Sequence, residues 1–162
     1  MRTVRRHLAV LAGLLVAYSA TSISQTTTPR DYATDPRLFK IKRFFRGLDS
    51  PAYFHAEDFL LAADRNGLDW RLLPSLSILE SGGGKKYMNN NILGWASCQQ
   101  KFPSVTAGIH HVAFRLAKSR LYRGKELDEV LSTYNPHHGY PRRIKELMNR
   151  LALGRGSPAG RP

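Results

Sequence analysis

Apolar side chains recur every three or four residues along most of the chain after residue 50, which is the spacing of amphipathic helices. Gly67 stands where the first of these helices would end, and Asp69 and Ser104 stand where two others would be capped. Pro74 falls near the first turn of the second helix, where its missing N–H costs least. The pattern predicts helices over residues 52–66, 69–80, 104–116, 127–134 and 142–151. The segment 81–103 is rich in Gly and Asn and predicts an irregular loop or a hairpin, so a mostly α fold is expected.

The N-terminal part of the chain has a different pattern. Residues 1–22 combine three arginines, an apolar run and small residues, which is the order of a secretory signal peptide; an uncleaved signal anchor is the alternative. The stretch RLFKIKRFFR at 37–46 is amphipathic and either caps the core or contacts a membrane surface. The predicted organisation is a signal peptide (1–22), a linker and amphipathic segment (23–48), a helical domain (49–152) and a disordered tail (153–162).

Charge narrows the classes of partner. The chain has 162 residues with 25 Lys and Arg against 12 Asp and Glu, a net charge of +13, and removal of residues 1–22 leaves +10 because it takes away three cations and no acid. This charge favours an anionic membrane, an acidic polymer or nucleic acid. We expect no nucleic acid, because RNP, zinc-finger and basic-zipper patterns are absent and an export signal argues against it. The single cysteine, Cys98, excludes a disulfide framework within the chain.

Two apparent motifs predict no site. The run SGGGKK has Leu79 where a phosphate-binding loop needs Gly, and no Ser or Thr follows Lys85. Adjacent histidines at 110–111 and 137–138 face different directions on a helix and lack metal-binding spacing. We therefore expect no metal and no cofactor.

Glu80 is the strongest candidate for catalysis. It ends the apolar stretch SLSILE and is followed at once by Ser81 and three glycines. The negative end of the helix dipole and apolar neighbours such as Ile78 both disfavour its charged form, which predicts a raised pKa. A general acid needs a raised pKa to keep its proton near neutral pH. The alternative is an ordinary exposed glutamate at a helix end.

The loop after this acid reads KKYMNNNILGW and has the composition of a carbohydrate-binding surface. Tyr87 and Trp95 can stack on sugar rings. Asn89, Asn90 and Asn91 can hydrogen-bond hydroxyl or acetamido groups. The alternative is a turn, because Asn tolerates left-handed backbone.

Three motifs in a fixed order, AADRNGLDWRLLPSLSILESGGGK, NNNILGW and YNPHHGY, resemble the bacterial glucosaminidases of the lysozyme-like superfamily. In that family a helix ends in Glu-Ser, an Asn-Asn-x-x-Gly loop follows, and a tyrosine lies far downstream. The resemblance covers residues 50–151, and the ordered set of motifs is its most specific part. It implies a mostly helical, lysozyme-like domain, with an irregular or hairpin loop after the catalytic helix, that cleaves the glycan strands of bacterial cell wall.

Carried over by position, the resemblance assigns roles to individual residues. Glu80 takes the place of the catalytic acid, and Tyr134 takes that of the tyrosine near it. Ser81 and Asn91 fall at positions that shape the site, and Trp95 follows the loop glycine. The expected substrate-binding residues are Ser81, Tyr87, Asn90, Asn91 and Trp95. The implied substrate is peptidoglycan that contains N-acetylglucosamine, and the expected location is the periplasm or cell envelope.

The distribution of acids leaves the reaction open. Residues 81–125 contain no Asp or Glu, whereas glycosidases of the two-carboxylate type need a second acid about 5–9.5 Å from the first. The remaining candidates for that second acid, which resemble capping or surface residues, are Asp58, Asp64, Asp69, Glu126, Asp128 and Glu129. A lone Glu80 suits a lytic transglycosylase, or a hydrolase assisted by the substrate acetamido group or by a geometry that Tyr134 holds. A wall-binding module without turnover and a cationic protein that binds nucleic acid or membrane are the other classes.

Overall fold

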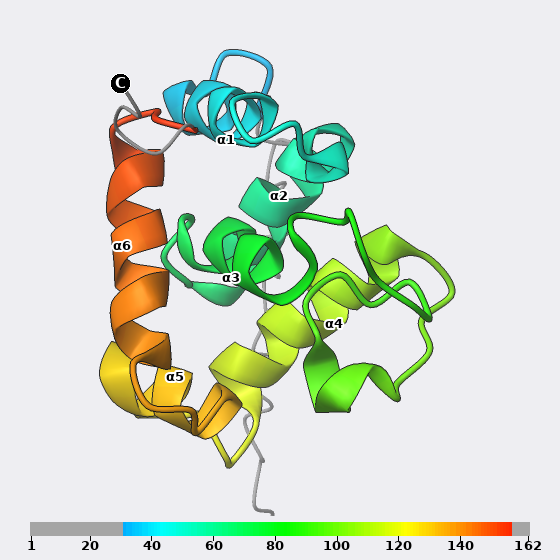
Figure 1. Cartoon of the computed structure of the whole chain (residues 1–162), viewed down its shortest axis with the longest axis vertical. Coiled ribbons are helices and arrows are strands. Elements are labelled where there is room, and N and C mark those ends of the chain that lie inside the picture. The colour runs from blue at the N-terminus through cyan, green and yellow to red at the C-terminus, as the bar shows by residue number, and fades with distance from the viewer. Residues whose placement is uncertain (1–30, 157–162) are drawn as a thin grey trace, which may run out of the picture. The chain divides into compact units, whose positions relative to one another are not determined.

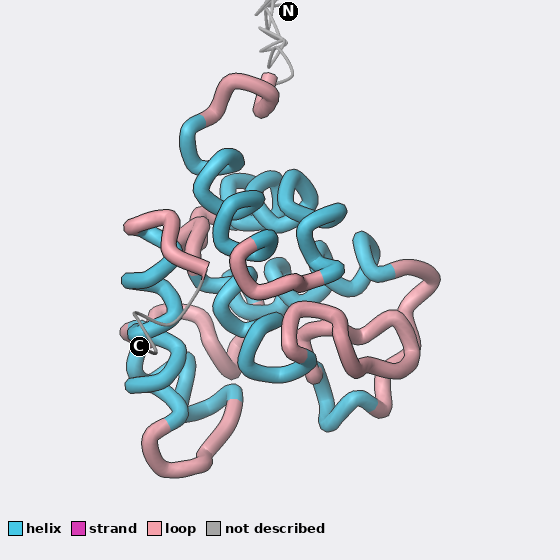
Figure 2. Tube along the Cα trace, turned by 45° about the horizontal axis from the view of Figure 1, so that its top comes forward, coloured by secondary structure: helices cyan, strands magenta, loops and turns pink. Residues whose placement is uncertain are grey.

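A computed structural model describes residues 31–156, so the predicted signal peptide (1–22) and the linker up to residue 30 lie outside the described residues. Within 31–156 the chain forms helices joined by loops, with no β strand, as Figure 2 shows. The mostly α fold predicted from the sequence is confirmed and is consistent with a lysozyme-like domain. The elements are α1 (Pro36–Arg46), the 3-10 helix η1 (Pro51–His55), α2 (Ala56–Asn66), α3 (Leu72–Ser81), the 3-10 helix η2 (Trp95–Cys98), α4 (Val105–Lys118), α5 (Leu127–Tyr134) and α6 (Tyr140–Ala152). Among the described residues, none of the helices combines the length and the hydrophobicity of a membrane-spanning segment.

The helix ends largely follow the signals in the sequence. Gly67 ends α2 in left-handed backbone, with φ of 65°, and the Ser104 hydroxyl caps α4 by accepting the N–H of Ala107 at 3.1 Å. The predicted cap of α3 is wrong by two residues. The Asp69 carboxylate accepts the N–H of Arg71 at 2.9 Å and forms a turn, and α3 begins only after it.

Helix α3 lies at the centre of the fold, with α1 above it and α6 beside it (Figure 1). It packs against α2 and α6, and every residue from 72 to 77 is buried. Two of these buried residues are serines, and the Ser77 hydroxyl donates to the carbonyl of Pro74 at 2.8 Å. A helix enclosed on most sides holds the residues at its C-terminal end in a fixed place.

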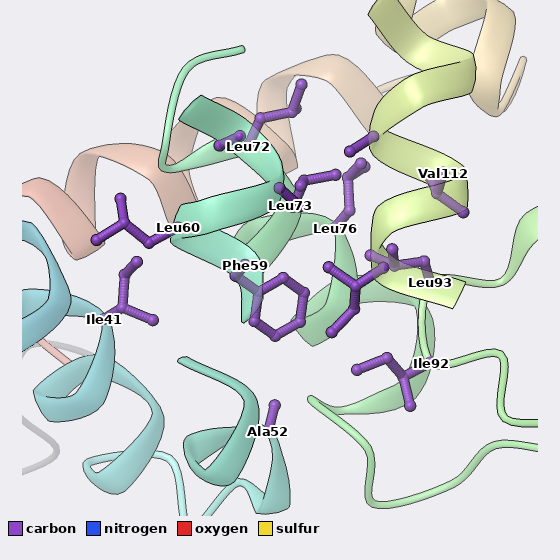
Figure 3. Packing of buried hydrophobic residues seen from close by; sticks show 14 of the residues in the cluster. Ile41, Ala52, Phe59, Leu60, Leu72, Leu73, Leu76, Ile92, Leu93 and Val112 are labelled. Atoms are coloured by element: carbon purple, nitrogen blue, oxygen red, sulfur yellow. The ribbon is translucent and has the colours of Figure 1, made fainter. Parts of the chain in front are cut away.

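The hydrophobic core reaches back into α1. Figure 3 shows Phe59 at the centre of the core, with Ile41 on one side and Leu93 on the other. The apolar face of α1 is buried through Leu38, Ile41, Phe44 and Phe45. The predicted core-capping role of this amphipathic segment is confirmed, and the same core extends to residues before position 49.

The start of the C-terminal tail is part of the folded unit. Helix α6 ends at Ala152, and Gly156 packs so closely against Gly47 that a Cβ on either glycine would overlap the other backbone. The Arg150 guanidinium donates to the Gly156 carbonyl. Residues 153–156 of the tail predicted as disordered are therefore held against the end of α1, and residues 157–162 lie outside the described residues.

Candidate active site

The last turn of α3 is fixed by glycine backbone. Gly82 has φ of 64°, and its N–H donates to the Ile78 carbonyl at 3.0 Å. The N–H of Gly83 donates to the Ser77 carbonyl at 2.9 Å. This pattern of bonds closes a helix end and satisfies carbonyls that would otherwise lack donors. It holds Glu80, which lies inside this last turn.

Glu80 is half-buried, and its carboxylate accepts a hydrogen bond from the Tyr140 hydroxyl at 2.5 Å. Burial raises the pKa of the Glu80 carboxyl above its ordinary value, and the bond from Tyr140 opposes part of that rise. The raised pKa predicted from the position of Glu80 agrees with this direction, and burial is its main cause. Glu80 therefore keeps its proton to higher pH than an exposed glutamate does, as a general acid requires.

Gly94 packs against Glu80 from the loop. Gly94 has φ of 69°, which side chains other than glycine rarely adopt. A Cβ at this position would overlap the Oε2 atom of Glu80. Both constraints require glycine, so the loop backbone can lie directly against the carboxyl.

The Asn run makes hydrogen bonds within the loop. The Asn89 amide donates to the Cys98 carbonyl at 3.0 Å, and the Asn90 amide donates to the Phe102 carbonyl at 2.9 Å. Asn91 is only 1% exposed. Its amide donates to the Trp95 carbonyl at 2.8 Å and its oxygen accepts the Trp95 N–H at 2.9 Å. These amides stabilise the loop that carries the pocket residues, and their described bonds are to protein backbone.

Ser81 joins the end of α3 to the same loop. Its hydroxyl lies 2.7 Å from the Ile92 carbonyl and 3.0 Å from the Ser77 carbonyl, and it accepts the N–H of Gly84 at 2.9 Å. The side chain is buried. Ser81 thus holds the end of α3 and the loop together from inside the protein.

Three consecutive non-glycine residues near the pocket have left-handed backbone. Ala96, Ser97 and Cys98 have φ of 51°, 53° and 62°. Such conformations cost about 1–2 kcal/mol each and persist only where the surroundings impose them. The amides of Asn89 and Asn91 hold this turn at its two ends, because they donate to the carbonyls of Cys98, its last residue, and Trp95, the residue before it.

A pocket of about 550 Å³ opens beside Glu80. Its other lining residues come from the loop, the end of α4, the α4–α5 turn and the end of α5, and they are Gly94, Trp95, Ala96, Ser97, Arg115, Leu121, Tyr122, Tyr134, Asn135 and Pro136. The Trp95 ring lies 6.0 Å from the Tyr122 ring and 5.8 Å from the Tyr134 ring. An aromatic wall beside a protonatable carboxyl suits a sugar ring and its glycosidic oxygen.

The predicted site residues divide into three groups. Glu80, Trp95 and Tyr134 come together as lining residues of the pocket. Ser81, Asn90 and Asn91 lie behind the pocket and make the loop bonds described above. Tyr87 is 48% exposed and is absent from the pocket lining.

Tyr140 is the contact that sequence reasoning missed. The Tyr134 hydroxyl donates to the Leu93 carbonyl, whereas the hydroxyl that reaches Glu80 belongs to Tyr140. The two tyrosine rings are stacked with centroids 6.3 Å apart. Burial raises the pKa of both phenols, so both donate as neutral hydroxyl groups. Both residues stand in the YNPHHGY motif, and the signal that favours Tyr140 is its place on the buried face of α6.

Glu80 is the only carboxylate among the described lining residues of the pocket. The other acids considered from the sequence are engaged elsewhere. Asp58 accepts from Thr106 at 2.9 Å, and Asp128 pairs with Lys145 at 2.8 Å. Glu126 and Glu129 cap the start of α5. Asp64 and Asp69 bind Arg37 and Arg71. The geometry therefore offers one acid to a substrate in this pocket.

Residues 31–156 contain no cluster of three or more His, Cys, Asp or Glu side chains that could hold a metal ion. Comparison with known proteins adds no assignment, because no protein-family model and no curated protein matches the chain.

Proposed function

We propose that this chain is an exported enzyme that cleaves the glycan strands of peptidoglycan containing N-acetylglucosamine, with Glu80 as the general acid. The observation that carries the proposal is the Glu80 carboxyl, with a raised pKa, beside a pocket lined by Trp95, Tyr122 and Tyr134. The motifs that resemble those of bacterial glucosaminidases support the same substrate. The positive charge of the chain suits an anionic wall polymer.

In the first step, protonated Glu80 donates its proton to the glycosidic oxygen while the bond from that oxygen to the anomeric carbon breaks. Positive charge then develops on the sugar ring, as in other glycoside cleavages. Tyr140 orients the acid through its bond to Oε1, and Gly94 limits the space on the Oε2 side. Trp95 and Tyr134 offer faces for the ring.

For the second step, the described lining residues of the pocket offer no carboxylate other than Glu80. In one route the acetamido oxygen of the substrate attacks the anomeric carbon, and water then opens the resulting ring while Glu80 accepts a proton from that water. In the other route, that of a lytic transglycosylase, the C6 hydroxyl of muramic acid attacks and Glu80 accepts its proton. The single acid in the pocket lining favours these two routes over a two-carboxylate mechanism. A wall-binding module without turnover is the remaining alternative.

Digestion of purified sacculi, followed by mass spectrometry of the sugar ends, tests the proposal. Reducing N-acetylglucosamine ends are expected for a glucosaminidase, and anhydro-muramic ends for a lytic transglycosylase. Glu80→Gln is expected to lower cleavage about 10³-fold, because general-acid catalysis contributes about 10²–10⁴-fold. Glu57→Gln, at an exposed carboxylate in the first turn of α2, is the matched control and should cleave like the parent.

Two outcomes would contradict the proposal. Near-normal cleavage by Glu80→Gln would remove Glu80 from the chemistry. Binding to sacculi without any new sugar ends would support the non-catalytic module.

A further inference from the structure

The solvent face of α1 carries an exposed apolar side chain at the start of a row of cations. Phe39 is 76% exposed. Lys42, Arg43 and Arg46 follow it by three, four and seven residues, so all four side chains share one face of the helix. The apolar face of α1 that packs into the core lies on the other side. An exposed phenylalanine on a polar helix face has no role in packing the core.

Helix η1 extends this face with two more aromatic rings. The Arg46 guanidinium lies 5.0 Å from the centre of the Tyr53 ring and donates to the Tyr53 hydroxyl at 2.8 Å. Phe54 meets the Tyr53 ring edge-on, with centroids 5.5 Å apart, and is 84% exposed. Phe39 and Tyr53 both line a groove of about 540 Å³. The basic aromatic surface, as we name it, consists of Phe39, Lys42, Arg43, Arg46, Tyr53 and Phe54, together with Lys40, which lines a second groove with Phe39 and Arg43.

The cations of this surface are available to an external anion. Lys40, Lys42, Arg43 and Arg46 form no ion pair with any described residue. Arg37, on the same helix, is by contrast held between two aspartates. Each free cation near an anionic lipid surface contributes about 1 kcal/mol to binding.

A soluble anionic polymer would satisfy these cations but leave Phe39 and Phe54 in water. The interface of an anionic bilayer accepts both kinds of group, since aromatic side chains enter the acyl boundary while cations stay at the headgroups. We propose that the basic aromatic surface docks the protein on an anionic phospholipid bilayer. This docking is independent of glycan cleavage.

The orientation that results places the pocket away from the lipid. In Figure 1, α1 lies at the upper edge of the folded unit, whereas α5 lies at the lower edge. The end of α5 lines the pocket beside Glu80 through Tyr134. A molecule docked through α1 therefore presents this pocket to whatever lies beyond the membrane surface.

Sedimentation with vesicles tests the proposal. The chain from residue 23 retains every described core residue, and it excludes the apolar N-terminal run that would bind lipid by itself. It is expected to bind vesicles of phosphatidylglycerol and phosphatidylethanolamine, and not vesicles of phosphatidylcholine. Phe39→Ser with Phe54→Ser, and separately Lys40→Glu with Lys42→Glu, should each weaken binding about tenfold or more.

Matched controls distinguish binding through this surface from nonspecific hydrophobic or electrostatic binding to vesicles. Phe114→Ser removes a phenylalanine that is 57% exposed on α4, and Lys118→Glu with Arg120→Glu reverses two cations at the end of that helix. Both controls should bind vesicles within about twofold of the parent. Circular dichroism and thermal unfolding establish that each variant is folded. Equal losses in the controls, or unchanged binding when Phe39 and Phe54 are replaced, would overturn the proposal.

Discussion

The hydroxyl of Tyr140 controls how easily Glu80 ionises. Its hydrogen bond stabilises the charged carboxylate and so lowers the pKa that burial raises. Tyr140→Phe removes this bond, so the pKa of Glu80 should rise further and the acid should stay protonated to higher pH. We expect the alkaline limb of the pH profile of glycan cleavage to move to higher pH, because a general acid loses activity as it ionises and Glu80 would then ionise at higher pH.

Tyr134→Phe is the control for this shift. The Tyr134 hydroxyl donates to the Leu93 carbonyl and not to Glu80, so the alkaline limb should keep its position even if the rate falls. A purely structural role for Tyr140 would lower the rate without moving the limb. An unchanged limb in Tyr140→Phe, or a move to lower pH, would be inconsistent with the assigned contact.

Gly94 offers a second test at the scale of one residue. In Gly94→Ala the added Cβ would overlap Glu80 Oε2, and φ of 69° adds backbone strain of about 1–2 kcal/mol. We expect cleavage of sacculi to fall about 10²-fold, because small misplacements of catalytic groups have effects of this size. Gly124→Ala is the matched control, because Gly124 has a similar positive φ of 77° but open space where the Cβ would lie. Equal activity losses in the two variants would refute a specific contact with Glu80.

The sequence predicts part of this site and leaves the rest to tertiary structure. Glu80 is identifiable because the end of a buried helix and the glycines after it are both local features. The choice between Tyr134 and Tyr140 is not local, since it depends on how α6 packs against α3 and how α5 packs against α6. Tyr87 and Trp95 are both aromatic residues of one loop, yet only Trp95 lines the pocket. Side-chain direction in an irregular loop has no period from which it can be predicted.

At the scale of elements, the helices form where the periodicity of apolar residues predicts them. The conformation of the loop 82–104 depends instead on specific hydrogen bonds. Helix α5 has its predicted bounds because its apolar residues and capping acids agree. Helix α3 begins later than predicted because Asp69 uses its side chain in a turn. The side-chain amides of Asn89, Asn90 and Asn91 hold the loop together by hydrogen bonds to its backbone. The composition of the loop had predicted that these amides contact sugar.

Asn91 is the strongest of these loop contacts and supplies an element-scale prediction. Asn91→Ala leaves both backbone groups of Trp95 without their buried partner, so we expect a loss of unfolding free energy of about 2–3 kcal/mol. Activity should fall as well, because the same bonds position the pocket wall. Asn89→Gly is the control, since it removes one exposed bond at φ of 57° and should cost under about 1 kcal/mol. Urea unfolding measures both, and equal losses would contradict the bracing role of Asn91.

At the scale of the whole molecule, helix α1 supplies part of the common hydrophobic core. The predicted domain starts at residue 49, yet Leu38, Ile41, Phe44 and Phe45 are buried in the common core. Burial of four such side chains contributes about 6–12 kcal/mol, which is comparable to the total stability of about 5–15 kcal/mol for a domain.

A chain that begins at residue 49 should therefore lack cooperative thermal unfolding and expose its core to hydrophobic dyes. A chain that begins at residue 31 should unfold in one transition. The matched control is Phe39→Ser in the longer chain, because Phe39 lies on the exposed face of the same helix and its loss should leave Tm within about 2 °C. Circular dichroism across a temperature ramp distinguishes these outcomes. Cooperative unfolding of the chain from residue 49 at a similar Tm would show that the domain folds without α1. The fold would then no longer fix the orientation of the pocket relative to the basic aromatic surface.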